Sequence, residues 1–227
     1  MIKYILKAMR PKQWTKNVFV FAAVVFDVKL FQLEPAFRTI GAFILFCLLS
    51  SSVYIFNDIM DVEADRNHPI KKNRPIASGK LPIKMALSVG AILLLVVFVA
   101  SFWLSPALFA VCAVYFVLNL AYSKWLKHIP LIDVLVIAAC FVLRVVAGVS
   151  VIEVERFSPW LYICMTLLAL YLGFGKRRAE LSIMVPENST SHRKVLSGYS
   201  IELIDQLITI VSATTIIAYS LYTFSAP

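Results

Sequence analysis

Long apolar stretches recur along the chain, separated by short polar segments. Each stretch runs for 17 or more mostly apolar residues, close to the ~20 that an α-helix needs to cross the hydrocarbon of a bilayer. The pattern predicts an all-α fold, a polytopic transmembrane helical bundle that forms a single membrane domain over residues 1–227. We expect seven spans, at about 17–33, 37–56, 84–103, 105–121, 131–150, 158–174 and 201–224.

The residues before the first span have a different pattern. Ile2, Leu6 and Met9 fall on one face of a helix, while Lys3 and Lys7 fall on the opposite face. An amphipathic helix of this kind lies in the plane of the membrane interface. Residues 1–16 are therefore predicted to form an interfacial helix.

Composition and charge agree with a membrane protein and indicate its orientation. Hydrophobic residues make up 60% of the 227 residues and the mean hydropathy is +0.83, which is too apolar for a water-exposed surface. If the spans alternate, 18 of the 22 Lys and Arg residues lie on the side of the N-terminus, which makes that side cytoplasmic. This distribution accounts for the net charge of +9, and no DNA-binding or RNA-binding motif accompanies it. We expect an integral protein of the inner (cytoplasmic) membrane that contacts the lipid bilayer and no nucleic acid.

One cytoplasmic segment, "NDIMDVEADRNHPIKKNRPIASG" at 57–79, concentrates acidic and amide side chains. Asn57, Asp58, Asp61 and Asp65 stand at i, i+1, i+4 and i+8. A continuing helix would place Asn57, Asp61 and Asp65 on one face with Asp58 beside them. Ligands that are all oxygens favour Mg²⁺, which binds one or two carboxylates together with phosphate oxygens. We therefore expect these four residues to hold Mg²⁺; the alternative is a solvated loop whose acids pair with nearby Lys and Arg.

The same segment carries the spacing NDxxDxxxD followed by RPxxSG, which resembles the first aspartate-rich motif of the UbiA superfamily of membrane prenyltransferases. The resemblance implies a Mg²⁺-diphosphate site at the cytoplasmic mouth of a helical bundle, with Asp58, Asp61 and Asp65 in catalytic roles. It also implies two more transmembrane helices than the seven expected here. The missing pair would come from a longer chain or from a second copy in a homo-oligomer.

The second cytoplasmic cluster departs from the pattern of that superfamily. Members that use a prenyl diphosphate have a second DxxxD motif, but residues 175–200 contain no aspartate, and "GKRRAEL" stands at 175–181. Together with "MRPKQWTKN" at 9–17, this sequence resembles one branch of the superfamily, the decaprenyl-phosphate phosphoribosyltransferases. The resemblance implies an enzyme that joins phosphoribosyl pyrophosphate to a polyprenyl phosphate and releases pyrophosphate.

Roles for the basic cluster follow from that chemistry. Lys176 and Arg177 are expected to bind the 5-phosphate of phosphoribosyl pyrophosphate, since Lys and Arg are the usual phosphate ligands. Glu180 is a further candidate catalytic residue, which would either complete the metal shell or bond the ribose hydroxyls. It lies four residues after Lys176 and should share its helical face. A purely topogenic role of the basic residues is the alternative.

The remaining candidate substrate-binding residues are polar or charged groups near the cytoplasmic span ends or inside a span: Lys16, Asn17, Arg66, Lys71, Arg74, Tyr122, Lys127, Asp133 and Arg144. Interfacial anchoring is an equal alternative for Tyr122 and Lys127. Asp133 and Arg144 lie 11 residues apart, close to three helical turns, so they should project from the same face of one span. Ionisable groups at that depth usually face a cavity or a partner, and Arg144 suits the phosphate of the lipid.

Two other functions stay open on the sequence. A prenyltransferase of the same superfamily that acts on an aromatic acceptor in quinone synthesis would need an acidic second motif, which residues 175–200 lack. A cation or lipid transporter would use the acidic cluster as a cation site. Incorporation of label from phosphoribosyl pyrophosphate into lipid separates these functions.

Overall fold

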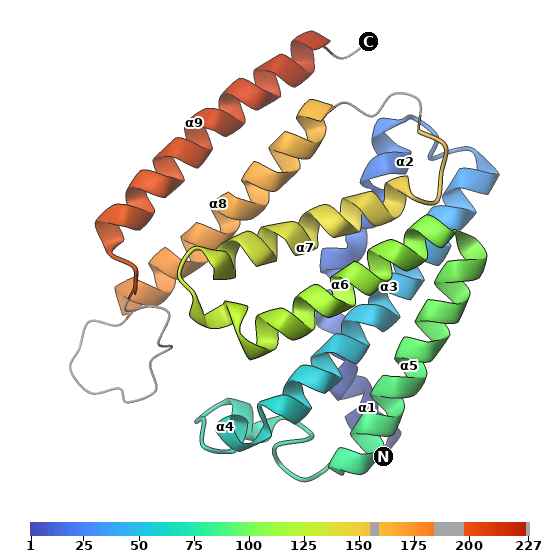
Figure 1. Ribbon diagram of the computed structural model, residues 1–227, viewed down its shortest axis with the longest axis vertical. Helices are drawn as coiled ribbons and strands as arrows, with labels where there is room; N and C mark the ends of the chain where they lie inside the picture. The colour runs from blue at the N-terminus through green and yellow to red at the C-terminus, as the bar shows by residue number, and fades with distance from the viewer. Residues whose placement is uncertain (155–158, 184–197, 226–227) are drawn as a thin grey trace. The chain divides into compact units, whose positions relative to one another are not determined.

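Figure 1 shows the computed structural model, which describes residues 1–154, 159–183 and 198–225. The described residues are helical or lie in turns and loops, with no strand among them, as the all-α prediction requires. The α-helices are α1 Ile2–Met9, α2 Ala22–Phe26, α3 Leu33–Met60, α4 Val62–Arg66, α5 Ile83–Leu104, α6 Pro106–Lys124, α7 Ile132–Val149, α8 Pro159–Ile183 and α9 Ile201–Ser225. The 3₁₀ helices are η1 Pro11–Phe21, η2 Lys71–Asn73 and η3 Leu126–His128.

Six helices of the described chain are long and apolar enough to cross a bilayer, namely α3, α5, α6, α7, α8 and α9. They coincide with the last six predicted spans. In hydrocarbon every backbone polar group needs an internal hydrogen bond, so a long apolar run has few alternatives to a helix. The first predicted span, at 17–33, is not a single α-helix in the structure.

That first segment folds as η1 followed by α2. Arg10 ends α1 in the left-handed conformation (φ 53°), and Pro11, which has no backbone N–H to continue α1, begins η1. The interfacial helix therefore ends at Met9 and not at residue 16. A 3₁₀ helix rises about 2.0 Å per residue, so η1 and α2 together extend about 30 Å, roughly the thickness of the hydrocarbon. The segment is long enough for a bilayer although it contains no long α-helix.

Close packing holds η1 in this conformation. Gly148 of α7 lies so near that a Cβ on it would sit 1.9 Å from the carbonyl oxygen of Val20. The buried Asn17 side chain donates to Ser50 Oγ (3.2 Å) and to Cys47 Sγ (3.4 Å) of α3. These contacts join segments that are far apart in sequence, so the local hydrophobic pattern does not reveal them.

The chain forms two compact units, here called the N-terminal unit (residues 1–120 and 144–154) and the C-terminal unit (residues 121–143 and 155–227). In the N-terminal unit α3 packs along α5 and is also contacted by α1 and η1. The Ser52 hydroxyl of α3 donates to the Gly90 carbonyl of α5 (2.9 Å), and a Cβ on Gly90 would lie 3.3 Å from Ile55. Small residues that allow such an approach are typical of transmembrane helix pairs.

Lys29 and Arg38, which the predicted alternation of spans places on the side opposite the N-terminus, have structural partners in the N-terminal unit. Arg38 donates from Nε to the Val151 carbonyl (2.7 Å) and from Nη2 to the Leu104 carbonyl (3.0 Å), near the C-terminal ends of α7 and α5. Lys29 forms an ion pair with Asp27 at 3.0 Å. Carbonyls at helix C-termini lack intrahelical donors, so Arg38 stabilises these helix ends.

In the C-terminal unit α8 and α9 lie along each other and share an apolar core with the first part of α7. Gly173 lets α8 approach α7, since a Cβ on it would lie 2.6 Å from Val134 Cγ1. The buried residues of this core are Val134, Phe174, Tyr199, Ile204 and Val211. The core fixes the start of α7 against the charged part of α8.

Candidate active site

The acidic motif lies where α3 ends and α4 begins. Asp61 is the residue between the two helices, so the continuous helix assumed from the spacing is interrupted there. The carboxylates that come together are those of Asp58 and Asp65, and both are buried. Asn57 and Asp61 are half-buried. The structure thus buries Asp58 and Asp65 more deeply than the other two residues, and the binding of Mg²⁺ by all four stays a prediction.

Arg74 joins the two carboxylates. Its Nη1 lies 3.1 Å from Asp58 Oδ1 and 2.6 Å from Asp65 Oδ2, so two oxygens converge on one positively charged group. Arg74 begins the RPxxSG sequence, and its extended backbone (φ −66°, ψ 147°) is the conformation that a following proline favours. Gly79 ends the turn at φ 74°, where glycine avoids the strain that a side chain would cause.

An apolar cluster fixes this turn against α1 and α3. Ile76 and Leu81 pack with Ala8 and Met9 of α1 and with Ile55 of α3, and all five are buried. Burying a large aliphatic side chain contributes about 1.5–3 kcal/mol. The cluster therefore holds α1, the RPxxSG turn and the end of α3 in one arrangement, which positions the charged residues that they carry.

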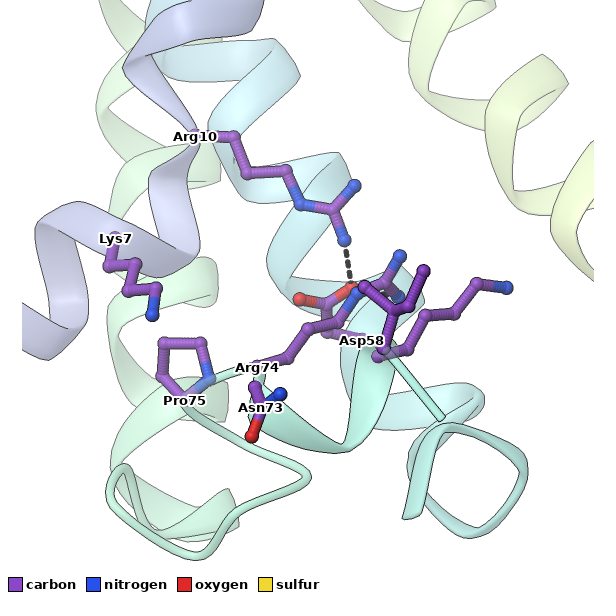
Figure 2. Close-up of a pocket in the computed structure, with 8 residues that line it drawn as sticks. Lys7, Arg10, Asp58, Asn73, Arg74 and Pro75 are labelled. Atoms are coloured by element: carbon purple, nitrogen blue, oxygen red, sulfur yellow. Dashed lines mark hydrogen bonds and ion pairs between the residues drawn. The ribbon is translucent and has the colours of Figure 1, made fainter. Parts of the chain in front are cut away.

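Arg10, at the end of α1, points to the same carboxylate as Arg74 (Figure 2). Its Nη2 forms an ion pair with Asp58 Oδ1, and its guanidinium lies 4.9 Å from the centre of the Tyr54 ring. These groups border a pocket of about 340 Å³. Four basic residues and one carboxylate are among its lining residues, which are Lys7, Arg10, Asp58, Ile70, Lys71, Asn73, Arg74 and Pro75. The pocket therefore has an excess of positive charge next to a buried carboxylate.

Asp58 and Asp65 suit a divalent cation, because both are carboxylates and an oxygen of each contacts the same nitrogen of Arg74. In the part of the chain that the structure describes, no group of three His, Cys, Asp or Glu side chains could hold a metal ion. Mg²⁺, however, binds one or two protein carboxylates and takes its other ligands from water and phosphate oxygens. Arg74 Nη1 stands where Asp58 and Asp65 converge, and a bound cation would take that place. The donor set thus fits Mg²⁺ together with a phosphate ligand.

The C-terminal unit contains a second buried charged cluster, built on the GKRRAEL sequence of α8. The Arg177 side chain is 1% exposed; its Nε lies 2.9 Å from Asp133 Oδ2 of α7, and its Nη1 forms an ion pair with Glu180. Tyr199 donates a hydrogen bond to Asp133 and accepts one from the Leu131 amide (2.7 Å). Burial, together with the bond to Asp133, raises the pKa of Tyr199, so this residue stays protonated and remains a donor.

Within GKRRAEL, Glu180 forms an ion pair with Arg177, three residues before it. The expectation that Lys176 and Glu180 share a helical face at the substrate stays a prediction. Lys176 is exposed, and Arg178 forms an exposed ion pair with α9. Asp133 explains why Arg177 is the buried member of the basic run. A buried carboxylate needs a compensating cation, so the Arg177 face of α8 turns inward.

Asn17 and Arg144, both predicted as substrate ligands, belong to one buried polar cluster of the N-terminal unit. Arg144 donates from Nε to Asn17 Oδ1 (2.9 Å) and from Nη2 to the Tyr115 hydroxyl (2.8 Å). Its guanidinium lies 5.1 Å from the centre of the Tyr115 ring. The cluster ties η1 to α6 and α7, and the role of these residues towards substrate stays a prediction.

The other predicted substrate ligands occur in both units. In the N-terminal unit Arg66 forms an ion pair within α4, Lys71 lines the pocket and Lys16 is exposed. In the C-terminal unit Tyr122 and Lys127 are half-buried. Their contacts with substrate also stay predictions.

Comparison with known proteins identifies the family. Residues 18–175 match the model of the UbiA prenyltransferase family. The chain belongs to this family. A decaprenyl-phosphate phosphoribosyltransferase from Mycolicibacterium smegmatis is 35% identical over 229 residues, which cover 99% of this chain and 71% of that protein. A protein of the same name from Mycobacterium tuberculosis is 34% identical over 224 residues, which cover 97% of this chain and 74% of that protein.

A solved structure confirms that this UbiA-family chain has the expected fold. A UbiA homologue from Archaeoglobus fulgidus, bound to GPP and Mg²⁺, aligns with a TM-score of 0.80 at 19% identity. The alignment covers 99% of this chain and 79% of that chain. The UbiA-type helical bundle predicted from the sequence is therefore correct.

Arg10 and Lys7 are not among the site residues predicted from the sequence of this UbiA-family chain, although Arg10 lies in the MRPKQWTKN motif. Their charges are typical of the polar face of an interfacial helix. The available signal is the Arg-Pro pair at 10–11, because proline disfavours a helical conformation in the residue before it. What brings Arg10 to Asp58 is the packing of Ala8 and Met9 against the RPxxSG turn, which is a tertiary contact.

Proposed function

We propose that this chain transfers 5-phosphoribose from phosphoribosyl pyrophosphate to a polyprenyl phosphate of the decaprenyl type and releases pyrophosphate. Its similarity to decaprenyl-phosphate phosphoribosyltransferases over 97% and 99% of the chain supports this reaction. The structural observation that carries the proposal is the convergence of Asp58 and Asp65 beside a pocket lined by four basic residues. A donor with a diphosphate and a separate phosphate needs a metal site and several cations, and these two features supply both.

Asp58 and Asp65 would hold a Mg²⁺ ion, with Asn57 and Asp61 at the adjacent positions of the motif. Such an ion supplies positive charge to a leaving diphosphate. Arg74, which bridges the two carboxylates in the structure, would then bind diphosphate oxygens, because a guanidinium forms strong charge-assisted hydrogen bonds with them. The two carboxylates and Arg74 together bind and orient the leaving group.

The bond changes require no acid or base from the protein. An oxygen of the lipid phosphate forms a bond to C1 of the ribose, the bond from C1 to pyrophosphate breaks, and its electron pair leaves with pyrophosphate. The nucleophile is already an anion, so no general base is needed. Direct displacement inverts the configuration at C1. The protein contributes orientation and the stabilisation of charge on two anionic substrates.

The charged cluster of the C-terminal unit contributes in a different way. We assign Arg177 and Asp133 a positioning role, because both side chains are 1% exposed and each neutralises the other. Lys176 is exposed and the Glu180 side chain is 30% exposed. These two residues are the candidates for substrate contact in this unit.

Six apolar helices in the described residues make the chain a multi-pass membrane protein. We place it in the cytoplasmic membrane with the Asp58 pocket on the cytoplasmic side. Phosphoribosyl pyrophosphate is a soluble polyanion, and the Lys and Arg residues are concentrated on that side of the predicted topology.

Purified full-length protein in nanodiscs tests the proposed function. With ribose-labelled phosphoribosyl pyrophosphate, decaprenyl phosphate and Mg²⁺, label should move into the organic phase. Excess EDTA should stop the transfer, and so should Asp65→Ala. Glu63→Gln changes an exposed acid of the same short helix and should leave the transfer unchanged. Label that stays in the aqueous phase under all conditions contradicts the proposal.

A further inference from the structure

We infer that Lys7, Arg10 and Lys71 form a subsite for a phosphate monoester beside the Asp58 carboxylate. Both substrates of the proposed reaction carry a phosphate monoester, whereas a prenyl diphosphate carries none. The subsite would therefore adapt the UbiA site to phosphoribosyl transfer. This inference rests on the proposed function for the identity of the substrates, and the anion site itself is testable without turnover.

The charges in the pocket are unbalanced. Arg10 and Arg74 share the Asp58 carboxylate, and Arg74 also binds Asp65. Lys7 lines the same pocket, and within the described residues its ammonium group has no hydrogen bond or ion pair. A phosphate monoester carries about −1.5 to −2 charges at neutral pH. Its binding would add negative charge to a pocket that four basic residues and one carboxylate line.

Arg10 is preorganised to bind a second anion. A guanidinium has five N–H donors, and the ion pair with Asp58 engages only the Nη2 nitrogen of Arg10. The left-handed backbone at Arg10 and the stacking of its guanidinium on Tyr54 hold the side chain in place. Little conformational entropy would be lost when the donors that have no partner among the described residues bind phosphate oxygens.

The size of the pocket also suits a sugar phosphate. Its volume of about 340 Å³ lies at the lower end of the ~300–1,000 Å³ typical of small-molecule sites. Lys7 and Arg10 belong to the α1 region (Figure 2), while Lys71 begins η2. Cations from two segments thus meet at one pocket, as binding of a compact anion requires.

The GKRRAEL cluster is a weaker candidate for the same phosphate. Arg177 is bound to two carboxylates, and Arg178 is paired with Asp205. Of that basic run, only Lys176 has no ion pair within the described chain. The pocket beside Asp58 therefore offers more cationic donors to a phosphate than α8 does.

Equilibrium binding in EDTA tests the subsite apart from catalysis. Full-length protein in nanodiscs is titrated with ribose 5-phosphate, with ribose as the probe that lacks phosphate, and with farnesyl phosphate as the lipid monoester. Lys7→Gln is compared with Lys3→Gln, which removes the same charge from an exposed position of α1 outside the pocket lining. We expect Lys7→Gln to weaken ribose 5-phosphate binding about tenfold or more, as the loss of a charged hydrogen bond does. Lys3→Gln should leave the binding unchanged, and ribose should not bind to any of the proteins.

The two possible sources of the phosphate give different results. A selective loss of ribose 5-phosphate binding assigns the subsite to the sugar, and a selective loss of farnesyl phosphate binding assigns it to the lipid; both support the inference. Lys176→Gln is titrated in the same way. The inference is overturned if Lys7→Gln and Lys3→Gln have equal effects, if Lys7→Gln leaves binding unchanged, or if binding is lost only in Lys176→Gln. If binding behaves as expected and the protein transfers no phosphoribose, the subsite stands and the proposed function fails.

Discussion

Replacing Arg177 with methionine tests whether this buried cation is a structural ion or a substrate ligand. The side chains of Arg177 and Asp133 are each 1% exposed, with Nε and Oδ2 2.9 Å apart. Without the cation, the Asp133 carboxylate stays buried with Tyr199 as its remaining side-chain donor among the described residues. Removing one partner of a buried ion pair costs about 3–5 kcal/mol. At ~2–4 °C per kcal/mol for a chain of this length, Arg177→Met should melt about 6–20 °C below the parent protein.

Two further variants separate the burial of charge from the loss of packing. Arg178→Met removes the neighbouring cation, whose ion pair with Asp205 is exposed on both sides, and should change the melting temperature little. Asp133→Asn combined with Arg177→Met leaves no uncompensated buried charge in the pair and should recover most of the lost stability. Melting is followed by intrinsic fluorescence in detergent, and the KM for phosphoribosyl pyrophosphate is measured in parallel. An Arg177→Met protein that melts like the parent but has a strongly raised KM would refute the structural assignment.

Three other changes probe the proposed metal site and the hydrogen bonds of Arg38. Asp65→Ala should abolish both Mg²⁺-dependent turnover and the thermal stabilisation by Mg²⁺, while Glu63→Gln should keep both. Turnover that survives in Asp65→Ala would rule out this carboxylate as a metal ligand. Arg74→Gln should lower the Mg²⁺ concentration that gives half-maximal thermal stabilisation, because Arg74 Nη1 no longer competes with the ion for the two carboxylates. An unchanged concentration would place the ion elsewhere. Arg38→Gln should lower the free energy of unfolding by about 1–3 kcal/mol without changing KM, because its hydrogen bonds to two carbonyls are lost. Equal stability of the variant and the parent would show that these bonds are dispensable.

The long transmembrane helices could be predicted because length and hydropathy decide them. The 22 residues of α5, for example, are almost all apolar, and in hydrocarbon such a run must satisfy its own backbone. The conformation of η1 could not be predicted in this way. Its apolar residues are compatible with an α-helix as well as a 3₁₀ helix, and the structure holds it through Gly148 and Asn17, whose partners lie far away in sequence.

The same distinction between local sequence and tertiary contacts applies to the candidate site. Asp58, Asp65 and Arg74 lie in one short motif, so their spacing predicts that they act together. Arg10 stands 48 residues before Asp58, and only the packing of α1 on the RPxxSG turn brings the two into contact.

In α8, helical periodicity lets Glu180 face either Arg177 or Lys176. The choice is made by Asp133, which belongs to another helix. Local spacing therefore predicts which residues are functional candidates, and tertiary contacts decide their partners.

Competition between two donors tests the central claim most directly. Purified protein with Mg²⁺, decaprenyl phosphate and an aromatic acid acceptor receives equal concentrations of phosphoribosyl pyrophosphate and a prenyl diphosphate, and the products are identified by mass spectrometry. We predict a decaprenyl phosphate that carries a phosphoribosyl group, with pyrophosphate released in equal amount. A prenylated aromatic acid without any phosphoribosyl lipid would contradict the account.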